Sequence, residues 1–202
     1  MSYGVIGKYP NQKFNNSGIY TPNDVTELIN NKQWGGKLEH IETIEITTSQ
    51  DNDFLNLKED IYKHHIFFLT GVTTNAGGSE RIRVRFSNNG GTSYYAGGTD
   101  YSWSSLKVLS SGTATSHRDA DDNQIQTFQT NDTEYANGFI KVSGAGDPNS
   151  KTYVSFHGVM YGDEDMSFGG GCNEIPTIIN AIKIFTPTPT DAGTIKLYGY
   201  KL

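Results

Sequence analysis

Apolar and polar residues alternate along much of this chain, most clearly over residues 81–86. In that stretch three apolar residues alternate with three arginines: Ile82, Val84 and Phe86 with Arg81, Arg83 and Arg85. A period of two predicts a β-strand with one face buried and the other in water. Asn and Gly residues at 88–91 then allow a tight reversal before the aromatic segment 94–103. The pattern therefore predicts a β-hairpin as the first unit of the fold.

Short runs of the same kind recur along the rest of the chain. They predict about nine strands, over residues 43–47, 62–72, 81–86, 101–109, 125–130, 139–143, 152–161, 178–185 and 194–201. The 62–72 segment is apolar on both faces in its second half, which predicts a central strand. The polar stretch 110–123 is interpreted as a long loop, and 144–148 and 187–191 as shorter ones. Strands separated by Gly, Pro and Asn predict an all-β, antiparallel sandwich or barrel.

The first forty residues follow a different pattern. Residues 1–20 contain few aliphatic side chains and cannot offset their own ordering entropy. Thr21 can then cap a helix that starts at Pro22, and apolar residues at helical spacing predict one short helix over residues 22–31. We therefore expect an anchoring arm with a short helix over residues 1–38 and a β domain over residues 39–202.

Composition supports an all-β domain and narrows the range of partners. The chain has 202 residues, with 23 Gly, 12% aromatic and only 19% charged residues, which is typical of turn-rich β-sandwiches. Its formal charge of −6 gives no reason to expect binding to nucleic acid or to an anionic membrane. The arginine strand is too small for a phosphate-binding footprint, so we interpret it as an exposed face or an intersubunit contact with carboxylates. No long apolar run or leader pattern occurs, which predicts a soluble product made in the cytoplasm.

Two separated motifs resemble a family of bacteriophage virion structural proteins of the marine and cyanophage type. The first is RFSNNGGTSYYAGGTDYSW, in which a strand ending in serine leads through a Gly-Gly-Thr turn into a DYSW strand. The second is the closing AGTIKLYGYKL. The resemblance spans residues 39–202 and implies a two-sheet jelly-roll sandwich in a protein of the phage particle.

Histidine and cysteine give no metal or nucleophile pattern. His64 and His65 are adjacent in a predicted strand, so they point to opposite faces and cannot share one metal ion. The remaining histidines have no ligand spacing: His40, His117 and His157. Cys172 is alone and is interpreted as a small buried filler. No cofactor is expected.

Two acidic clusters could offer oxygen ligands to Ca²⁺. One is Asp119, Asp121 and Asp122, and the other is Asp163, Glu164 and Asp165. Neither has the spacing of an EF-hand loop, and both are also compatible with solvated acidic loops. Carboxylate abundance alone does not identify a glycosidase pair, and no nucleophile elbow, P-loop or dinucleotide motif is present. The sequence predicts no catalytic site and no enzyme.

Aromatic residues gather near the predicted hairpin: Tyr94, Tyr95, Tyr101 and Trp103. They could stack on sugars or form subunit contacts, or they could pack between the sheets. The first hypothesis is a virion structural protein, acting as tail fibre, appendage or head decoration. It would be homo-oligomeric and would dock on other virion proteins through the arm. The alternatives are a glycan-binding module for host attachment and, third, a glycan depolymerase.

Overall fold

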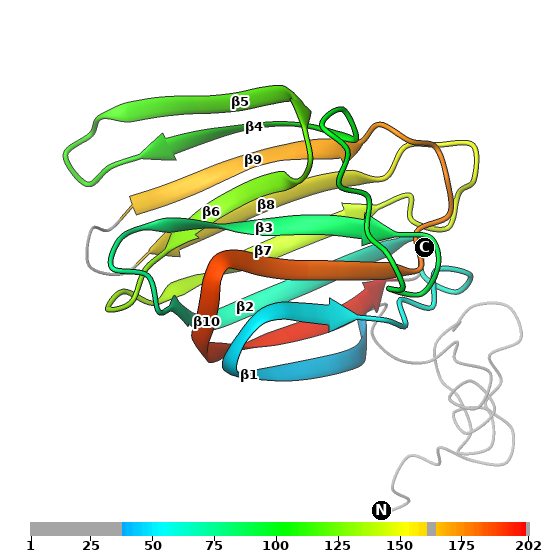
Figure 1. Ribbon diagram of the computed structural model, residues 1–202, viewed down its shortest axis with the longest axis horizontal. Helices are drawn as coiled ribbons and strands as arrows, with labels where there is room; N and C mark the ends of the chain where they lie inside the picture. The colour runs from blue at the N-terminus through cyan, green and yellow to red at the C-terminus, as the bar shows by residue number, and fades with distance from the viewer. Residues whose placement is uncertain (1–37, 161–164, 201–202) are drawn as a thin grey trace, which may run out of the picture. The chain divides into compact units, whose positions relative to one another are not determined.

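The computed structural model describes residues 38–160 and 165–200, and within those ranges the protein is all-β, antiparallel and without a helix (Figure 1). The all-β, antiparallel prediction is confirmed. The predicted helix at 22–31 and most of the predicted arm lie outside the described residues, and the domain boundary stays a prediction. The strands are β1 (Leu38–Phe54), β2 (His64–Thr74), β3 (Glu80–Ser87), β4 (Tyr101–Val108), β5 (Ala114–Asp122), β6 (Ile125–Thr130), β7 (Ala136–Ser143), β8 (Tyr153–Met160), β9 (Asp165–Asn173) and β10 (Ala181–Tyr200).

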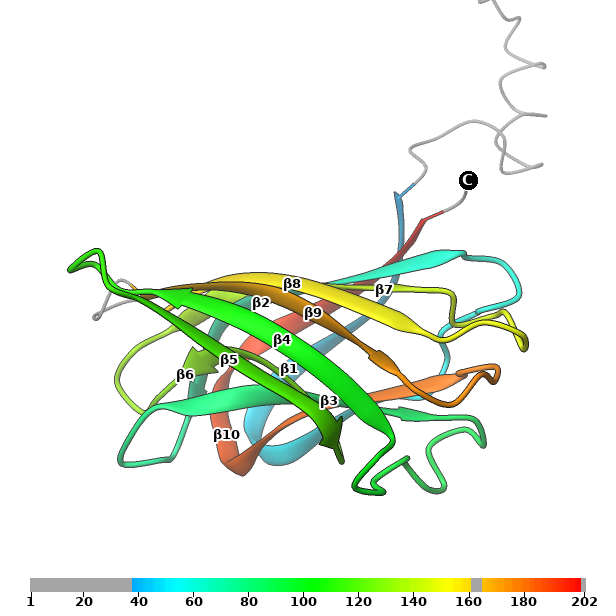
Figure 2. The same ribbon diagram turned by 90° about the horizontal axis from the view of Figure 1, so that it is seen from above.

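All ten described strands belong to one hydrogen-bonded sheet that is nearly closed into a barrel. Its order is β5-β4-β9-β8-β7-β2-β10-β3-β6, and β1 pairs with β10. The sheet folds over on itself so that β6 packs across β8 and β9 without being hydrogen-bonded to them (Figure 2). The strands at the two ends of the order, β5 and β6, leave the one opening in the ring.

The long strand β10 carries the sheet around its sharpest bend. Residues 190–200 pair with β2, whereas residues 181–185 pair with β3. Strand β1, which pairs with β10, shows a register shift beside this bend, between Ser49 and Asp51. The prediction of two strands separated by a loop at 187–191 was therefore wrong. Pro187 and Pro189 favoured a loop in the sequence, but they lie at the bend of one strand, where a missing N–H is tolerated.

The bend divides the sheet into a large layer and a small layer. The large layer contains β5, β4, β9, β8, β7, β2 and the second half of β10, and the small layer contains the first half of β10 with β3 and β6. Phe128 on β6 packs directly on Gly158 of β8, where an added Cβ would lie 2.2 Å from the ring. Glycine at this position lets the two layers approach each other.

The core between the layers is built by the alternation that the sequence shows. Phe67 and Leu69 from β2 and Ile195 and Leu197 from β10 are almost fully buried. Ile195 and Leu197 share the inward face of the last strand, and the predicted central position of β2 is confirmed. On β3 the buried residues are the three apolar ones of the alternating stretch, Ile82, Val84 and Phe86.

Three other expectations were wrong. The segments 81–87 and 101–108 do not form a hairpin, because β3 pairs with β10 and β6 whereas β4 pairs with β5 and β9. The chain between them crosses from the small layer to the large one. The polar stretch 110–123 is not a loop but contains β5, an edge strand that buries neither face and so shows no apolar alternation. Strand β9 was missed because Gly169, Gly170 and Gly171 disfavour strand predictions.

Candidate functional site

The aromatic cluster near residues 94–103 is mostly internal. Tyr101 is fully buried, and its hydroxyl accepts the N–H of Phe86 at 2.8 Å and donates to the carbonyl of Tyr95 at 3.1 Å. Burial raises the pKa of Tyr101. Trp103 is only 7% exposed. These two residues therefore tie the large layer to β3, as the packing interpretation expects, and neither offers a face for sugar stacking.

The opening between β4–β5 and β3–β6 is closed by polar side chains. The indole Nε1 of Trp103 donates to the Asp122 carboxylate at 2.8 Å, and the same carboxylate accepts from Gln126 at 3.3 Å. The Arg81 guanidinium lies over the Trp103 ring, 5.8 Å from its centroid, and donates to Ser105 Oγ at 3.3 Å. We call this region the seam: it holds the barrel together without backbone pairing.

A buried ion pair lies at one end of the seam. Asp165 on β9 is 3% exposed and pairs with the Lys107 ammonium on β4. Lys107 also donates to Gln129 Oε1 on β6, at 2.6 Å. Asp165 is thus tied to the seam, while its two neighbours in the acidic cluster, Asp163 and Glu164, lie outside the described residues.

The three arginines of β3 form a row on the outward face of the small layer, which we call the arginine row. Their side chains are half-buried rather than freely in water as the pattern suggested. Arg85 donates from Nε to the Asn123 carbonyl at 3.0 Å, and its guanidinium lies 5.0 Å from the centroid of the Phe185 ring. Burial lowers the pKa of the guanidinium of both Arg81 and Arg83. Among the described residues none of the three arginines forms an ion pair with a carboxylate.

The outward face of the large layer carries a row of aromatic residues. Pairing register places Phe168 opposite His157, His157 opposite Phe139, and Phe139 opposite Phe68. The three phenylalanines are 38% to 41% exposed. Leu106 extends this aromatic row at the β4 end, and Lys196 ends it on β10. Sequence reasoning missed the row because its members come from four strands and none stands out in its own segment.

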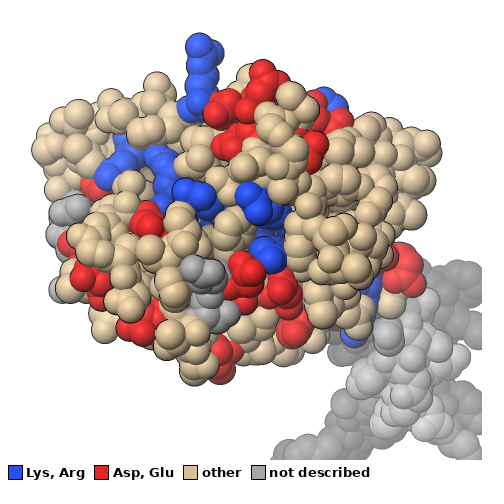
Figure 3. Space-filling model, in the orientation of Figure 1, with Lys and Arg blue, Asp and Glu red and all other residues tan. Residues whose placement is uncertain are grey.

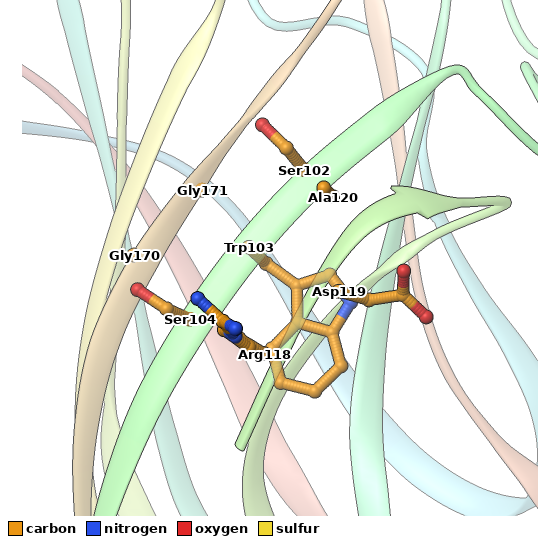
Figure 4. A pocket seen from close by; sticks show the side chains of 8 residues that line it. All are labelled: Ser102, Trp103, Ser104, Arg118, Asp119, Ala120, Gly170 and Gly171. Atoms are coloured by element: carbon orange, nitrogen blue, oxygen red, sulfur yellow. The ribbon is translucent and has the colours of Figure 1, made fainter. Parts of the chain in front are cut away.

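A shallow depression of about 300 Å³ lies beside the aromatic row, over β5, β4 and β9 (Figure 4). Ser102, Ser104 and Arg118 point to this outer side, whereas Trp103 and Asp119 point to the opposite side of the strands. The depression exists because β9 carries glycines there. An added Cβ at Gly171 would meet the Ser102 carbonyl at 2.4 Å, so close strand packing explains the glycines without a ligand.

The adjacent histidines point to opposite faces, as predicted. His65 is fully buried, and its Nε2 lies 2.7 Å from the Leu57 carbonyl, while burial lowers its pKa. His64 is half-buried on the outer face, where Nδ1 lies 2.8 Å from Ser143 Oγ. Burial also lowers the pKa of His64.

Cys172 is not the buried filler that its isolation suggested. It lies on the outer face of β9 and is partly exposed. Its thiol contacts Glu174 Oε1 at 3.2 Å, and burial raises its pKa. Glu174 also accepts from Ser102 at 2.6 Å and pairs with Lys151, which holds the pKa of Glu174 at about 2.

The structure brings no metal-binding set together in the part of the chain that it describes. There, no group of three or more His, Cys, Asp and Glu side chains lies close enough to hold a metal ion. Within the first acidic cluster, Asp119 accepts the N–H of Asp121 at 3.1 Å, and Asp122 is engaged by Trp103. Residues 38–160 and 165–200 likewise contain no helix long and apolar enough to cross a membrane.

Comparison of the chain with protein-family models gives no match, and comparisons with curated proteins and with solved structures give none either.

Proposed function

We propose that this chain is a structural protein of a bacteriophage particle that assembles through broad protein contacts, without catalysing a reaction. The observation that carries the proposal is the outer face of the large layer. Over β9, β8, β7 and β2, the outward positions of the described residues include no Arg, Asp or Glu and a single Lys, which is Lys141. The aromatic row crosses the middle of this weakly charged face. Depletion of charge with enrichment of aromatics is the composition of a subunit interface core.

The aromatic row suits contact with a second copy of the same chain. It reads Leu106, Phe168, His157, Phe139, Phe68, so a two-fold axis at His157 would place Phe168 on Phe139 of the second copy and Leu106 on its Phe68. A two-fold contact requires such a self-complementary surface. The large layer has seven strands side by side, and its typical strand has eight residues. Its outer face therefore measures roughly 26 by 29 Å, or about 750 Å². A stable interface buries about 800 Å² from each partner, so the outer face of the large layer is of comparable size.

The self-association is tested by sedimentation of the purified chain. The parent should sediment as a dimer or a larger assembly, and Phe139→Ser and Phe168→Ser should each shift it to monomer. Tyr135→Ser is the matched control, because Tyr135 is 52% exposed but lies outside the row. A parent that is monomeric at high concentration, or row variants that sediment like the parent, would reject this interface.

The virion role extends the resemblance to phage structural proteins with a jelly-roll domain. An antiparallel barrel folded into two layers supports that relationship. In this proposal residues 1–38 dock on other virion proteins, and the protein resides on the particle surface as fibre, appendage or decoration. Antibody labelling of intact particles should find it in regular copies, and deletion of residues 1–37 should abolish incorporation. Absence of the protein from purified particles would reject the role.

The alternative of a glycan-binding module has a different basis from the one that the sequence suggested. Tyr101 and Trp103 are buried, so the hairpin aromatics do not support it. What supports it is the arginine row, a set of cations without ion-pair partners among the described residues.

A further inference from the structure

The three arginines of β3 are not equivalent. Arg81 donates to the Thr127 carbonyl at 2.8 Å, where a register shift in the β3–β6 pairing leaves that carbonyl available. Arg85 donates to Asn123 and to Gln124. The side chain of Arg83, between them, makes no hydrogen bond to any described residue, and its Nε is buried without a partner. The two outer arginines therefore have a structural role, and the central one has none that the described residues show.

Arg83 lies in the middle of a cationic band. Consecutive arginines of the row are about 6.6 Å apart along the strand, and Lys183 is the partner of Arg85 on β10. Figure 3 shows Lys and Arg side chains gathered in a band across this face of the molecule, with Asp and Glu gathered on either side. Holding like charges side by side opposes folding unless a counter-charge is present. Burial lowers the pKa of Arg83, whereas the charges of Glu80 and Asp122 raise it, yet neither carboxylate forms an ion pair with it.

The surroundings of Arg83 favour one isolated anionic group on a ligand rich in hydroxyls. Gln126, opposite Arg83 on β6, is half-buried and provides an amide group beside this arginine, whereas Gln129 lies opposite Arg81 and accepts from Lys107. Asp122 stands within the same region, but its carboxylate oxygens already accept from Trp103, Gln126 and the Asn123 N–H. The flanking acidic residues would repel a continuous polyanion such as nucleic acid. A planar guanidinium matches a carboxylate through two parallel hydrogen bonds.

We propose that Arg83 anchors a binding site for a carboxylate-bearing sugar of the uronic acid type. The guanidinium holds the sugar carboxylate, and the amide oxygen of Gln126 accepts from a neighbouring hydroxyl. This inference deepens the glycan-binding alternative and does not depend on self-association through the aromatic row. A chain that stays monomeric can still bind the sugar.

The test measures binding of a galacto-oligosaccharide that ends in a single galacturonate to the full chain by calorimetry, with the neutral galacto-oligosaccharide of equal length beside it. The parent should bind the acidic oligosaccharide and not the neutral one. Arg83→Gln should weaken binding roughly 10- to 100-fold, as expected for loss of a charge-assisted pair. Arg83→Lys should weaken it less, because the charge remains while the bidentate geometry is lost. Arg118→Gln is the matched control and should bind like the parent, since Arg118 is exposed on the other side of β5.

Thermal unfolding of the same variants separates a ligand-binding role from a structural one. Arg83→Gln should leave the melting temperature unchanged or raise it, because no hydrogen bond to a described residue is lost and a like-charge contact is relieved. A marked fall in melting temperature would overturn the inference. So would a parent that does not bind the oligosaccharide with the single galacturonate, or an Arg83→Gln variant that binds it as the parent does. A parent that instead prefers a polyglutamate peptide, in an Arg83-dependent way, would assign the row to an acidic protein partner.

Discussion

The two places where this sheet closes on itself use different chemistry. At the β1–β10 bend, backbone hydrogen bonds continue on both sides, and the buried side chains include aliphatic residues such as Leu69 and Ile195 together with uncharged polar ones such as Asn52. At the seam the strands are not paired, and Trp103, Lys107 and Arg81 close the gap with polar contacts. The bend is therefore held by burial and by a repeated ladder, and the seam by individual side-chain pairs.

This difference determines what each region tolerates. An apolar, laddered region loses stability in proportion to the side-chain volume removed. A polar seam loses more than the contact itself when one partner is removed, because the other is left buried without a partner. Near the seam, the buried Nε of Arg83 has no hydrogen-bond partner among the described residues.

The largest effect is expected from breaking the bend. Truncation after Asp191 removes the half of β10 that pairs with β1 and β2, together with Ile195 and Leu197. Each such aliphatic contributes about 2–5 kcal/mol, and a domain has only about 5–15 kcal/mol in total. The truncated chain should show no cooperative thermal transition in circular dichroism.

Point variants sharpen the same prediction. Leu197→Ala should lower the free energy of unfolding by about 2–5 kcal/mol. The neighbouring Lys196→Ala, on the outward face, should change it by less than about 0.5 kcal/mol. Equal effects of the two substitutions would contradict the inward assignment of Leu197.

The next largest effect is expected at the seam. Lys107→Met leaves the buried Asp165 carboxylate without its ion pair, which should cost about 3–5 kcal/mol in denaturant unfolding. Lys107→Met with Asp165→Leu should recover most of that loss, since replacing both partners by apolar groups is often near neutral. Lys183→Met is the control, because its partner Asp51 is half exposed. A double variant as unstable as the single one would show that the pair does not act as a unit.

The strands on either side of the bend were largely predictable from sequence, whereas the bend itself and the seam were not. Period-two alternation located β2, β3 and the end of β10 because each buries one apolar face. It could not locate β5, whose exposed residues show no such alternation, or β9, whose glycines are explained by close neighbouring backbones. It also could not show that β3 and β4 lie in different layers, because the Gly-rich stretch between them favours a hairpin equally well.

Site residues were predictable only where one segment contained the whole pattern. The arginine row was visible in the sequence, since three alternating residues share a strand. Its asymmetry was not, because the acceptors that bind Arg81 and Arg85 come from the β5–β6 region. The aromatic row depends on the register of four strands, which a single sequence does not reveal.

A pH-dependent effect of intermediate size is expected from His65 in the apolar region. Its folded-state pKa lies below the ordinary 6.5, and its Nδ1 is buried without a partner. The unfolded chain therefore takes up a proton below about pH 6.5 that the folded chain resists, so stability falls as pH decreases, by up to about 1.4 kcal/mol per pH unit. Urea midpoints at about pH 7.5 and about pH 5.5 should differ less in His65→Gln than in the parent. His64→Gln, on the half-buried outer histidine, should flatten the dependence less, and an unchanged slope in His65→Gln would contradict this role.

The smallest effect is expected on the outer face, away from both closures, at Glu174. Its pKa is lowered to about 2, chiefly by the hydrogen bond from Lys151 and then by that from Ser102. A carboxyl with a lowered folded-state pKa stabilises the fold above its unfolded pKa, near 4.5, and this contribution is lost as pH falls towards 2. Both side chains of the ion pair are about a third exposed, so solvent screens most of their interaction. Glu174→Gln should therefore lower the melting temperature at neutral pH by no more than about 2 °C. The difference from the parent should vanish at about pH 2, whereas Asp132→Asn should show no such convergence. A loss at neutral pH as large as that of Lys107→Met would mean that the outer face, like the seam, is held by individual polar pairs.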